Sequence, residues 1–308
     1  MPRIRTPLAE RLGLDFPIVC APMFILSNKE MLLACAEAGI LGAMPSINLR
    51  SHDEFRDTLR WLRARTERAF AVNLTIKLTH PERLEQDFAA CLEFGVKAII
   101  TSYGNPRELA RRARAAGVVV MHDVIHLVHA LKAQDAGADA IIGVSSGAGG
   151  HAGTTSPFVL YPYLRKNLRV PVVAAGCIAT GQQMAAALSL GAELVYMGTR
   201  FIASTECGAD ERYKSMVVNG RPEDVEYTDA VSGVHANFLR ATLPGGAKAE
   251  RDAAQAEVQG AGGKKWKDIW SAGQGIALAT EVKPIAAIVA DLVREYAEAV
   301  RSLPAVEG

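Results

Sequence analysis

Short apolar runs alternate with longer amphipathic segments along most of the chain, and a glycine usually separates the two. The pattern reads AEAGILGAM at 36–44, LEFGVKAII at 92–100 and QDAGADAII at 134–142. A glycine at this point fits the end of a helix, because it adopts the left-handed conformation without strain. The run that follows shows no polar alternation, which is typical of a strand buried on both faces of a parallel sheet.

Eight such runs predict eight strands with helices between them. We expect the strands at 17–22, 40–45, 70–75, 98–102, 118–122, 140–145, 171–175 and 194–198. We expect helices at Lys29–Ala38, Pro81–Phe94, Pro106–Ala116, Ile125–Ala136 and Gly181–Leu190. Eight strands that alternate with helices predict an α/β fold of the (β/α)8 type, a TIM barrel. An open doubly wound sheet is the alternative, but no GxGxxG motif follows the first run.

The alternation stops after the eighth run. Residues 207–275 are polar and rich in glycine, as in LPGGAKAERDAAQAEVQGAGGKKW. We therefore expect a small, mostly helical insert at 207–275 that covers the barrel mouth or forms a dimer contact. The barrel itself would comprise 1–206 and 276–308, with a last amphipathic helix at about Pro284–Leu303.

Composition narrows the class of protein. The 308 residues are 49% hydrophobic and 22% charged, which suits a globular chain with a sizeable core. Thirty-four basic against 33 acidic residues leave a net charge of +1, so nucleic acid and anionic membranes are not expected partners. The five cysteines form no CxxC pair, which favours a reducing, cytoplasmic compartment without a zinc site or disulfide framework. No run approaches the roughly 18 apolar residues of a membrane span, and no signal peptide is evident.

The C-terminal ends of the strands are the expected place for chemistry in such a barrel. These ends carry Ala21-Pro22-Met23, Asn73, His122-Asp123, Ala175-Gly176-Cys177 and Met197-Gly198-Thr199. The last two, with the helix start at Thr180-Gly181, offer bare amides and a hydroxyl, which favours a phosphate site there. The same glycines are also common in tight strand–helix turns without any ligand.

One histidine stands among small residues in SSGAGGHAGTTSPF, at 145–158. Gly149 and Gly150 allow the backbone to approach a flat ring closely, and His151 can donate or accept a proton near neutral pH. A loose surface turn is the simpler interpretation of this stretch. Asn73 ends a buried strand, so its amide should bond a ligand or a neighbouring loop.

Other chemistries find less support in the sequence. Lys77 follows the third strand, where a Schiff-base lysine would have to lie inside the barrel. His122, His126 and His129 have a spacing that suggests metal ligands, but the last two fall in a helix that points away from the mouth. We expect no metal site.

Six motifs, taken in order, resemble the nitronate monooxygenases, formerly called 2-nitropropane dioxygenases. They are PIVCAPM at 17–23, VNLT at 72–75, GGHAGTTS at 149–156, VPVVAAGCIATG at 170–181, MGTRFIAS at 197–204 and WSAGQG at 270–275. The match is weakest at about 207–265. The superfamily also holds FMN-dependent enoyl-ACP reductases and NADH:quinone reductases.

The resemblance implies a barrel that binds FMN non-covalently and a catalytic His151. The residues that it implies for FMN are Ala21, Pro22, Met23, Asn73, Gly149, Gly150, Ala175, Gly176, Cys177, Met197, Gly198, Thr199, Gly273 and Gln274. The segment Trp270–Gln274 would close over the cofactor. Some quinone-reductase relatives have a lysine where this chain has Asp123, so the charge near the flavin would differ there.

The implied activity is oxidation of alkyl nitronates by O2 to a carbonyl compound and nitrite. An alternative is an NAD(P)H-dependent reductase acting on a quinone or an enoyl thioester, and either enzyme could be a homodimer. A phosphate-binding barrel without redox chemistry, such as a lyase or isomerase, is a candidate from another class. A pure binding protein is a further candidate.

Overall fold

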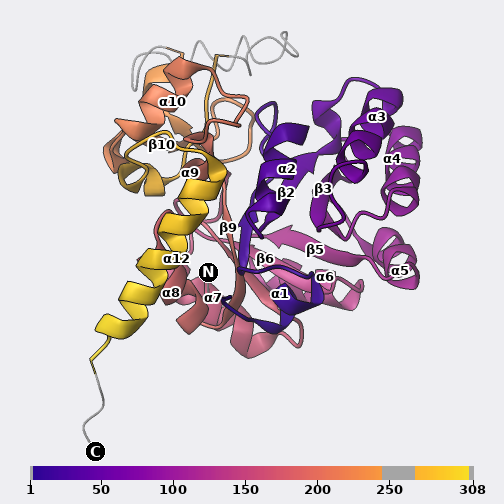
Figure 1. The fold of residues 1–308 in the computed structure, drawn as a ribbon, viewed down its shortest axis with the longest axis horizontal. Coiled ribbons are helices and arrows are strands. Elements are labelled where there is room, and N and C mark those ends of the chain that lie inside the picture. The colour runs from indigo at the N-terminus through magenta and orange to yellow at the C-terminus, as the bar shows by residue number, and fades with distance from the viewer. Residues whose placement is uncertain (1–2, 245–267, 305–308) are drawn as a thin grey trace, which may run out of the picture.

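The computed structural model describes residues 3–244 and 268–304, in which eight parallel strands form a closed barrel surrounded by helices (Figure 1). The order around the barrel is β1-β2-β3-β4-β5-β6-β8-β9. The strands are β1 (Ile18–Cys20), β2 (Leu41–Pro45), β3 (Phe70–Thr75), β4 (Ala98–Ser102), β5 (Val119–Val124), β6 (Ala140–Val144), β8 (Val172–Ala175) and β9 (Ala192–Met197). Each strand overlaps its predicted run, and the predicted (β/α)8 fold is confirmed.

The helices also follow the predicted pattern. They are α1 (Pro7–Arg11), α2 (Lys29–Glu37), α3 (His52–Arg63), α4 (Pro81–Glu93), α5 (Arg107–Ala115), α6 (Leu127–Asp135), α7 (Pro157–Asn167), α8 (Gly181–Ser189), α9 (Thr199–Ile202), α10 (Glu211–Val218) and α12 (Ile285–Ser302). Gly117 and Gly137 follow helix ends at φ of 71° and 98°, the conformation that the sequence required of them. None of the described helices is both long enough and apolar enough to cross a membrane.

Helix α1 plugs the N-terminal end of the barrel. Its Leu8 and Leu12 pack into the same buried cluster as the inward-facing strand residues. The N–H of Leu8 donates to Glu193 Oε2 at 2.8 Å, and Thr6 Oγ1 donates to the Glu193 carbonyl at 2.6 Å. A ligand of the barrel must therefore bind at the opposite, C-terminal end.

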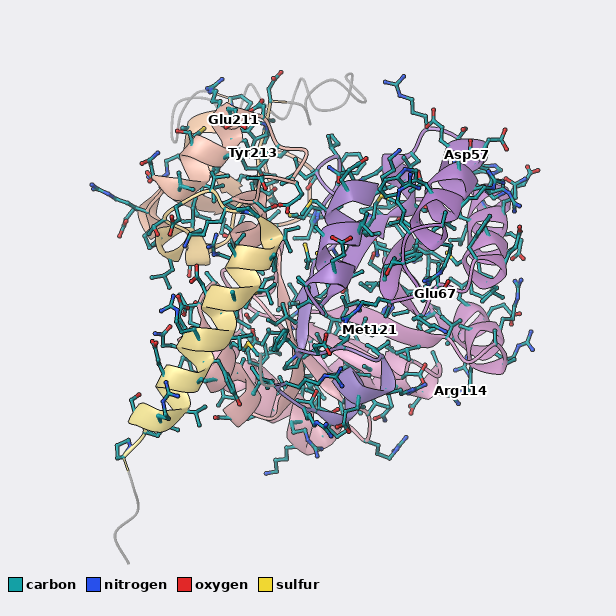
Figure 2. All side chains as sticks on the ribbon, viewed as in Figure 1. Asp57, Glu67, Arg114, Met121, Glu211 and Tyr213 are labelled. Carbon is teal, nitrogen blue, oxygen red and sulfur yellow. The ribbon has the colours of Figure 1, made fainter. Side chains whose placement is uncertain are left out.

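Side chains along each strand alternate between the barrel interior and the helical layer, because the side-chain period of a strand is two residues. On β5, Val119 and Met121 belong to the interior cluster, whereas Val120 packs with residues of α5. Figure 2 labels Met121 on this strand. The next residue, His122, points outward and bonds Thr101 Oγ1 at 2.8 Å through Nδ1. The expectation that His122 lies at the barrel mouth is therefore wrong, whereas Asp123, which was expected at the same strand end, does line the cavity there.

The insert after β9 contains α10 together with a β-hairpin of β10 (Val225–Thr228) and β11 (Ala236–Leu239). Strand β11 also pairs with β7 (Gly150–His151), which gives the sheet order β10-β11-β7. The sequences VEYT of β10 and ANFL of β11 lack the continuous apolar run that marks the barrel strands, and β7 comprises only two residues, so the sequence alone did not indicate this sheet. The rest of the expected helical insert, at 245–267, lies outside the described residues.

Helix α12 closes the ring of helices by packing along α8, as the two neighbouring ribbons in Figure 1 show. The contact is close at Gly181, where an added Cβ would lie only 2.3 Å from the Leu292 carbonyl oxygen. This helix matches the last helix expected at about Pro284–Leu303, while the predicted division of the chain into barrel and insert stays a prediction.

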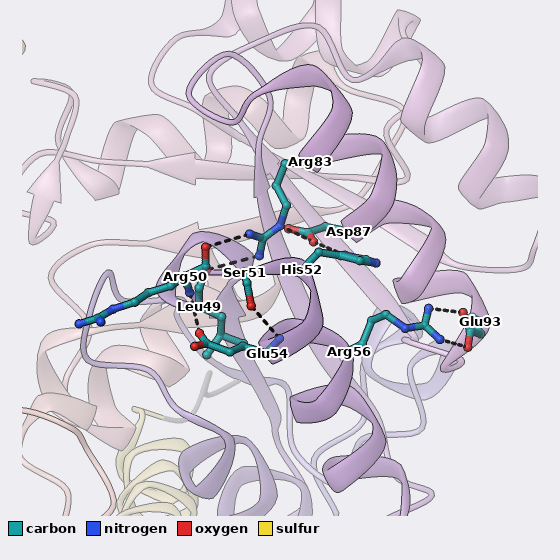
Figure 3. Close-up of polar contacts among 9 residues, drawn as sticks. All are labelled: Leu49, Arg50, Ser51, His52, Glu54, Arg56, Arg83, Asp87 and Glu93. Atoms are coloured by element: carbon teal, nitrogen blue, oxygen red, sulfur yellow. Dashed lines mark hydrogen bonds and ion pairs between the residues drawn. The ribbon is translucent and has the colours of Figure 1, made fainter.

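A polar cluster joins α3 and α4 on the outer face of the barrel (Figure 3). Asp87 is fully buried, and its Oδ1 accepts from Arg83 Nε at 2.7 Å and contacts His52 Nδ1 at 3.0 Å. The Arg83 guanidinium also reaches the carbonyls of Leu49 and Arg50. One carboxylate thus fixes the spacing of the two helices and of the loop before them.

Replacing Asp87 with alanine should lower the free energy of unfolding by about 2 kcal/mol, because Arg83 and His52 lose a buried partner. Urea denaturation measures the change. The control is Asp57→Ala on the exposed side of α3, which should change stability by less than about 0.5 kcal/mol. Equal effects of the two substitutions would contradict the role assigned to Asp87.

Candidate functional site

A cavity of about 850 Å³ opens at the C-terminal end of the barrel. The last inward-facing residue of each strand contributes to its floor. These residues are Ala21, Pro45, Thr75, Ser102, Asp123, Val144, Ala175 and Tyr196, and Asn73, two positions before Thr75 on β3, also lines the cavity. The alternation within the barrel therefore selects the side chains that a ligand would meet first.

The chain bends sharply after β8 and β9, which exposes backbone amides to the cavity. Gly176 and Cys177 have φ of 110° and 57°, and a residue other than glycine rarely adopts such a value. Within the described ranges, no acceptor is found for the N–H groups of Cys177, Gly198 and Thr199. A Cβ on Gly198 would meet nothing closer than Met23 Sδ at 3.8 Å. Unpaired donors beside open space are suited to bind an anion.

The helix start at Thr180-Gly181 does not contribute to this anion site, in contrast to the sequence-based expectation. Thr180 and Gln183 form a capping box, and the N–H of Gly181 donates to Glu295 Oε2 at 2.7 Å. The carboxylate of α12 thus occupies the N-terminus of α8, 114 residues away in sequence. The sequence alone does not predict this contact, because the two residues are distant in the chain.

The insert holds the loop that carries His151. Ala236 of β11 pairs with His151, and Asn237 Nδ2 donates to the Ala148 carbonyl at 2.7 Å. On the other side of the loop, a Cβ on Gly149 would lie 2.9 Å from the Gly273 nitrogen. The glycines of this stretch permit two backbones to pack against each other, so the loop is not a loose surface turn.

His151 lies at the exposed edge of the cavity, next to Tyr103 and Ser232. Its Nε2 is 3.3 Å from Ser232 Oγ, and its ring meets the Tyr103 ring edge-on at a centroid distance of 5.7 Å. Partial burial lowers the pKa of His151 below its ordinary value. The imidazole is therefore neutral at pH 7 and can accept a proton.

Asn73 bonds its neighbours on the barrel wall and retains one free oxygen. Its Nδ2 donates to the Ile100 carbonyl at 3.1 Å and to Ser102 Oγ at 3.2 Å. No partner of Asn73 Oδ1 is found among the described residues. The two alternatives expected for Asn73, a bond to its neighbours and a bond to a ligand, are therefore compatible.

Asp123 is the most unusual group in the cavity. Its Oδ1 is buried without a hydrogen bond in the described part of the chain, and burial raises the pKa of its carboxyl to about 7. No lysine or arginine occurs among the described lining residues. The other lining carboxylates are Asp210, which caps α10 through the Tyr213 N–H, and Asp268.

The outer rim of the cavity is apolar. Phe24, Ile25, Leu78 and Tyr103 line it, although their exposed fractions are between 40% and 64%. Ile25 and Tyr103 have φ of 68° and 54°, a conformation that costs free energy for a side chain of their size. The surrounding loops therefore hold apolar groups toward the opening.

Most of the residues expected at the site lie around this one cavity. The residues that the family resemblance implies all line it except Gln274, whose Oε1 is 4.0 Å from Cys177 Sγ, whereas His122, Thr180 and Gly181 do not line it. Their role in cofactor binding stays a prediction. Lys77, His126 and His129 are exposed and do not line it, and no group of metal-ligating side chains is found in the described residues.

Sequence reasoning did not assign a role to Asp123, Ser102 or Tyr196. The signal was present on β5, where Val119, Met121 and Asp123 share one face at the two-residue period. The same period on β9 places Leu194 and Tyr196 inside the barrel.

The raised pKa of Asp123 gives a testable pH dependence of stability. Between about pH 4 and pH 7 the unfolded carboxyl ionises while the folded one stays protonated, so the wild type loses stability as the pH rises. Asp123→Asn removes this pH-dependent loss of stability, because an amide does not ionise. For the proteins without bound ligand, the stability of the variant relative to the wild type should increase by 2–4 kcal/mol, as an order of magnitude, from pH 4 to pH 8. Urea denaturation at several pH values measures it, and a constant difference would contradict the assignment.

Comparisons with known proteins are consistent with this arrangement. The model of the nitronate monooxygenase family matches residues 5–295. A nitronate monooxygenase of Paraburkholderia phytofirmans is 29% identical, with 95% of each chain covered. A 5-hydroxy-7a-methyl-1-oxo-octahydro-1H-indene-4-carboxyl-CoA dehydrogenase of Rhodococcus jostii is 28% identical, with 87% of this chain and 77% of the relative covered. The structure of FabK from Thermotoga maritima is similar with a TM-score of 0.85 and 30% identity, covering 97% of this chain and 98% of FabK.

Proposed function

The chain belongs to the nitronate monooxygenase family of oxidoreductases, and we propose that it uses FMN to oxidise alkyl nitronates with O2 to a carbonyl compound and nitrite. The observation that carries this proposal is that two different kinds of polar group lie on opposite sides of the cavity. Free backbone amides lie at the ends of β8 and β9, and polar side chains lie on the strands across the barrel.

The cavity fits FMN in both size and chemistry. Its volume of about 850 Å³ is near the upper end of the 300–1,000 Å³ typical of ligand pockets, which leaves room for a substrate beside a cofactor. The amides of Cys177, Gly198 and Thr199 would hold the phosphate, and the open space at Gly198 allows close approach. Asn73 and Asp123 would face the polar part of the ring.

When bound, FMN supplies the electron transfer from substrate to O2. When a neutral nitroalkane is supplied in place of its nitronate, the neutral imidazole of His151 would first take the proton from the carbon next to nitrogen, which generates the nitronate substrate in the site. The imidazolium formed then pairs with a nitronate oxygen. Because β11 and Gly273 hold the loop from both sides, the backbone that carries the imidazole is fixed before substrate binds.

The apolar rim supports an alkyl substituent on the substrate. Phe24, Ile25 and Leu78 can cover a hydrocarbon chain that extends from the cavity. The absence of lysine and arginine from the described lining residues is a reason against a highly anionic tail in this part of the site.

An NAD(P)H-dependent reductase acting on an enoyl thioester or a quinone is the second candidate. The likeness to FabK over nearly the whole chain and the carboxyl-CoA dehydrogenase among the relatives favour it. The apolar rim would suit an acyl chain as well as an alkyl chain.

Two mixing experiments on the purified protein separate the candidates. The proposal expects a flavin absorbance band, and O2 consumption with nitrite release when a nitronate is added without NADH. Anaerobic NADH should bleach the flavin slowly. Rapid bleaching by NADH together with no nitronate turnover would favour the reductase, and a colourless protein that acquires no flavin would contradict both candidates.

His151→Gln should lower kcat with nitroalkanes by about 10²-fold at unchanged flavin content, because the proton acceptor is lost. For the wild type, kcat/KM should rise with pH through a pKa below the ordinary histidine value, since the base must be neutral. His235→Gln is the matched control. His235 contacts Tyr227 near the same opening but does not line the cavity, so its loss should have little effect. Unchanged turnover of the His151 variant would exclude this role.

A further inference from the structure

Apart from the Tyr196 hydroxyl on β9, the polar side chains on the cavity floor lie on one side of the barrel. Asn73, Ser102 and Asp123 come from the consecutive strands β3, β4 and β5, and Thr75 also lies on β3. The remaining floor residues are Ala21, Pro45, Val144, Ala175 and Tyr196. A flat ligand anchored at the amides after β8 and β9 and extended across the mouth would direct its far end toward these polar residues of β3 to β5.

Among the described residues, Asp123 has no partner that would stabilise a negative charge. Its Oδ1 is buried and unbonded within the described residues, and no described lysine or arginine lines the cavity. The titratable groups affected by its charge are two tyrosines, Tyr103 after β4 and Tyr196 on β9. Burial, together with the charge of Asp123, raises the pKa of Tyr103 to about 12 and that of Tyr196 well above its usual value, so both are neutral and neither supplies a cation. The adjacent strand β6 reads AIIGV and carries no titratable group.

To bind the acceptors of a ligand, Asn73, Ser102 and Asp123 must offer hydrogen-bond donors that face the cavity. Asn73 uses its Nδ2 within the wall, on the Ile100 carbonyl and Ser102 Oγ, which leaves its oxygen as an acceptor. Ser102 retains one hydroxyl proton. An ionised Asp123 would add only acceptors, whereas a protonated Asp123 adds a second donor.

We propose that Asp123 recognises the polar pyrimidine edge of the flavin as a neutral carboxylic acid that donates its proton to an acceptor of the ring. This edge presents carbonyl oxygens and ring nitrogens as acceptors, with one N–H that Asn73 Oδ1 can accept. The proposal rests on the FMN part of the proposed function and adds a recognition group with a defined protonation state. A neutral acid also leaves the site without a fixed negative charge next to the ring.

The dissociation constant of FMN tests this without reference to turnover. The holoenzymes of the wild type, Asp123→Asn and Asp123→Ala are diluted stepwise at pH 6 and pH 9, and released FMN is followed by its fluorescence. The asparagine retains an N–H donor and cannot ionise, whereas the alanine has no donor. Comparison between variants at one pH cancels the titration of FMN itself.

At pH 6 the wild type and Asp123→Asn should bind FMN within about threefold of each other, and Asp123→Ala about tenfold more weakly. At pH 9 the Asp123 carboxyl of the wild type is ionised before FMN binds. It must then either take up a proton, which costs binding free energy, or face the ring as an anion without a donor. The wild type should then be weaker than Asp123→Asn by about ten- to one-hundredfold, since the pKa near 7 lies two pH units below.

His122→Gln is the control on the same strand, because its side chain points away from the cavity. It should leave FMN affinity unchanged at both pH values. A wild-type to Asp123→Asn ratio that does not change with pH, or an Asp123→Ala variant that binds as tightly as the wild type at pH 6, would overturn the inference and leave the proposed activity standing. Failure of the wild type to bind flavin would overturn both.

Discussion

Closure of eight strands into a barrel imposes the constraint on which the site depends. Each strand can direct only alternate residues into the interior, and α1 fills the lower end with Leu8 and Leu12. What remains accessible is one or two inward side chains at the C-terminal end of each strand, together with the loops that follow. The chemistry of the cavity is thereby reduced to a few positions, among which Asn73 and Asp123 carry most of the polar character.

Three parts of the fold supply three different properties of the site. The bends after β8 and β9 supply bare amides, because Cys177 and Gly198 leave their N–H groups without acceptors among the described residues. The strands β3 to β5 supply polar side chains on a rigid wall. The insert supplies β11, which holds His151 by pairing with its loop. Rigid elements on both sides of the cavity keep the donors preorganised, so a bound ligand would not have to pay for ordering them.

The sequence predicted the barrel and most of the cavity lining because both depend on local pattern. Apolar runs that follow helix-ending glycines predict where the strands lie, and the residues at the strand ends follow from the positions of the strands. The sequence did not reveal contacts between distant segments. Glu295 occupies the N-terminus of α8, and β11 pairs with the His151 loop. Neither contact can be predicted from the residues adjacent to it in sequence. Asp123 is a different case, since its inward position follows from the two-residue period of β5 once His122 is recognised as outward.

A crystal structure of the protein with bound FMN would test the account most directly. The account predicts density for the phosphate against the amides of Cys177, Gly198 and Thr199, and for the polar edge of the ring against Asn73, Ser102 and Asp123. His151 should lie over the ring within reach of a substrate. A phosphate at the α8 N-terminus, or a ring whose apolar edge faces Asp123, would contradict it.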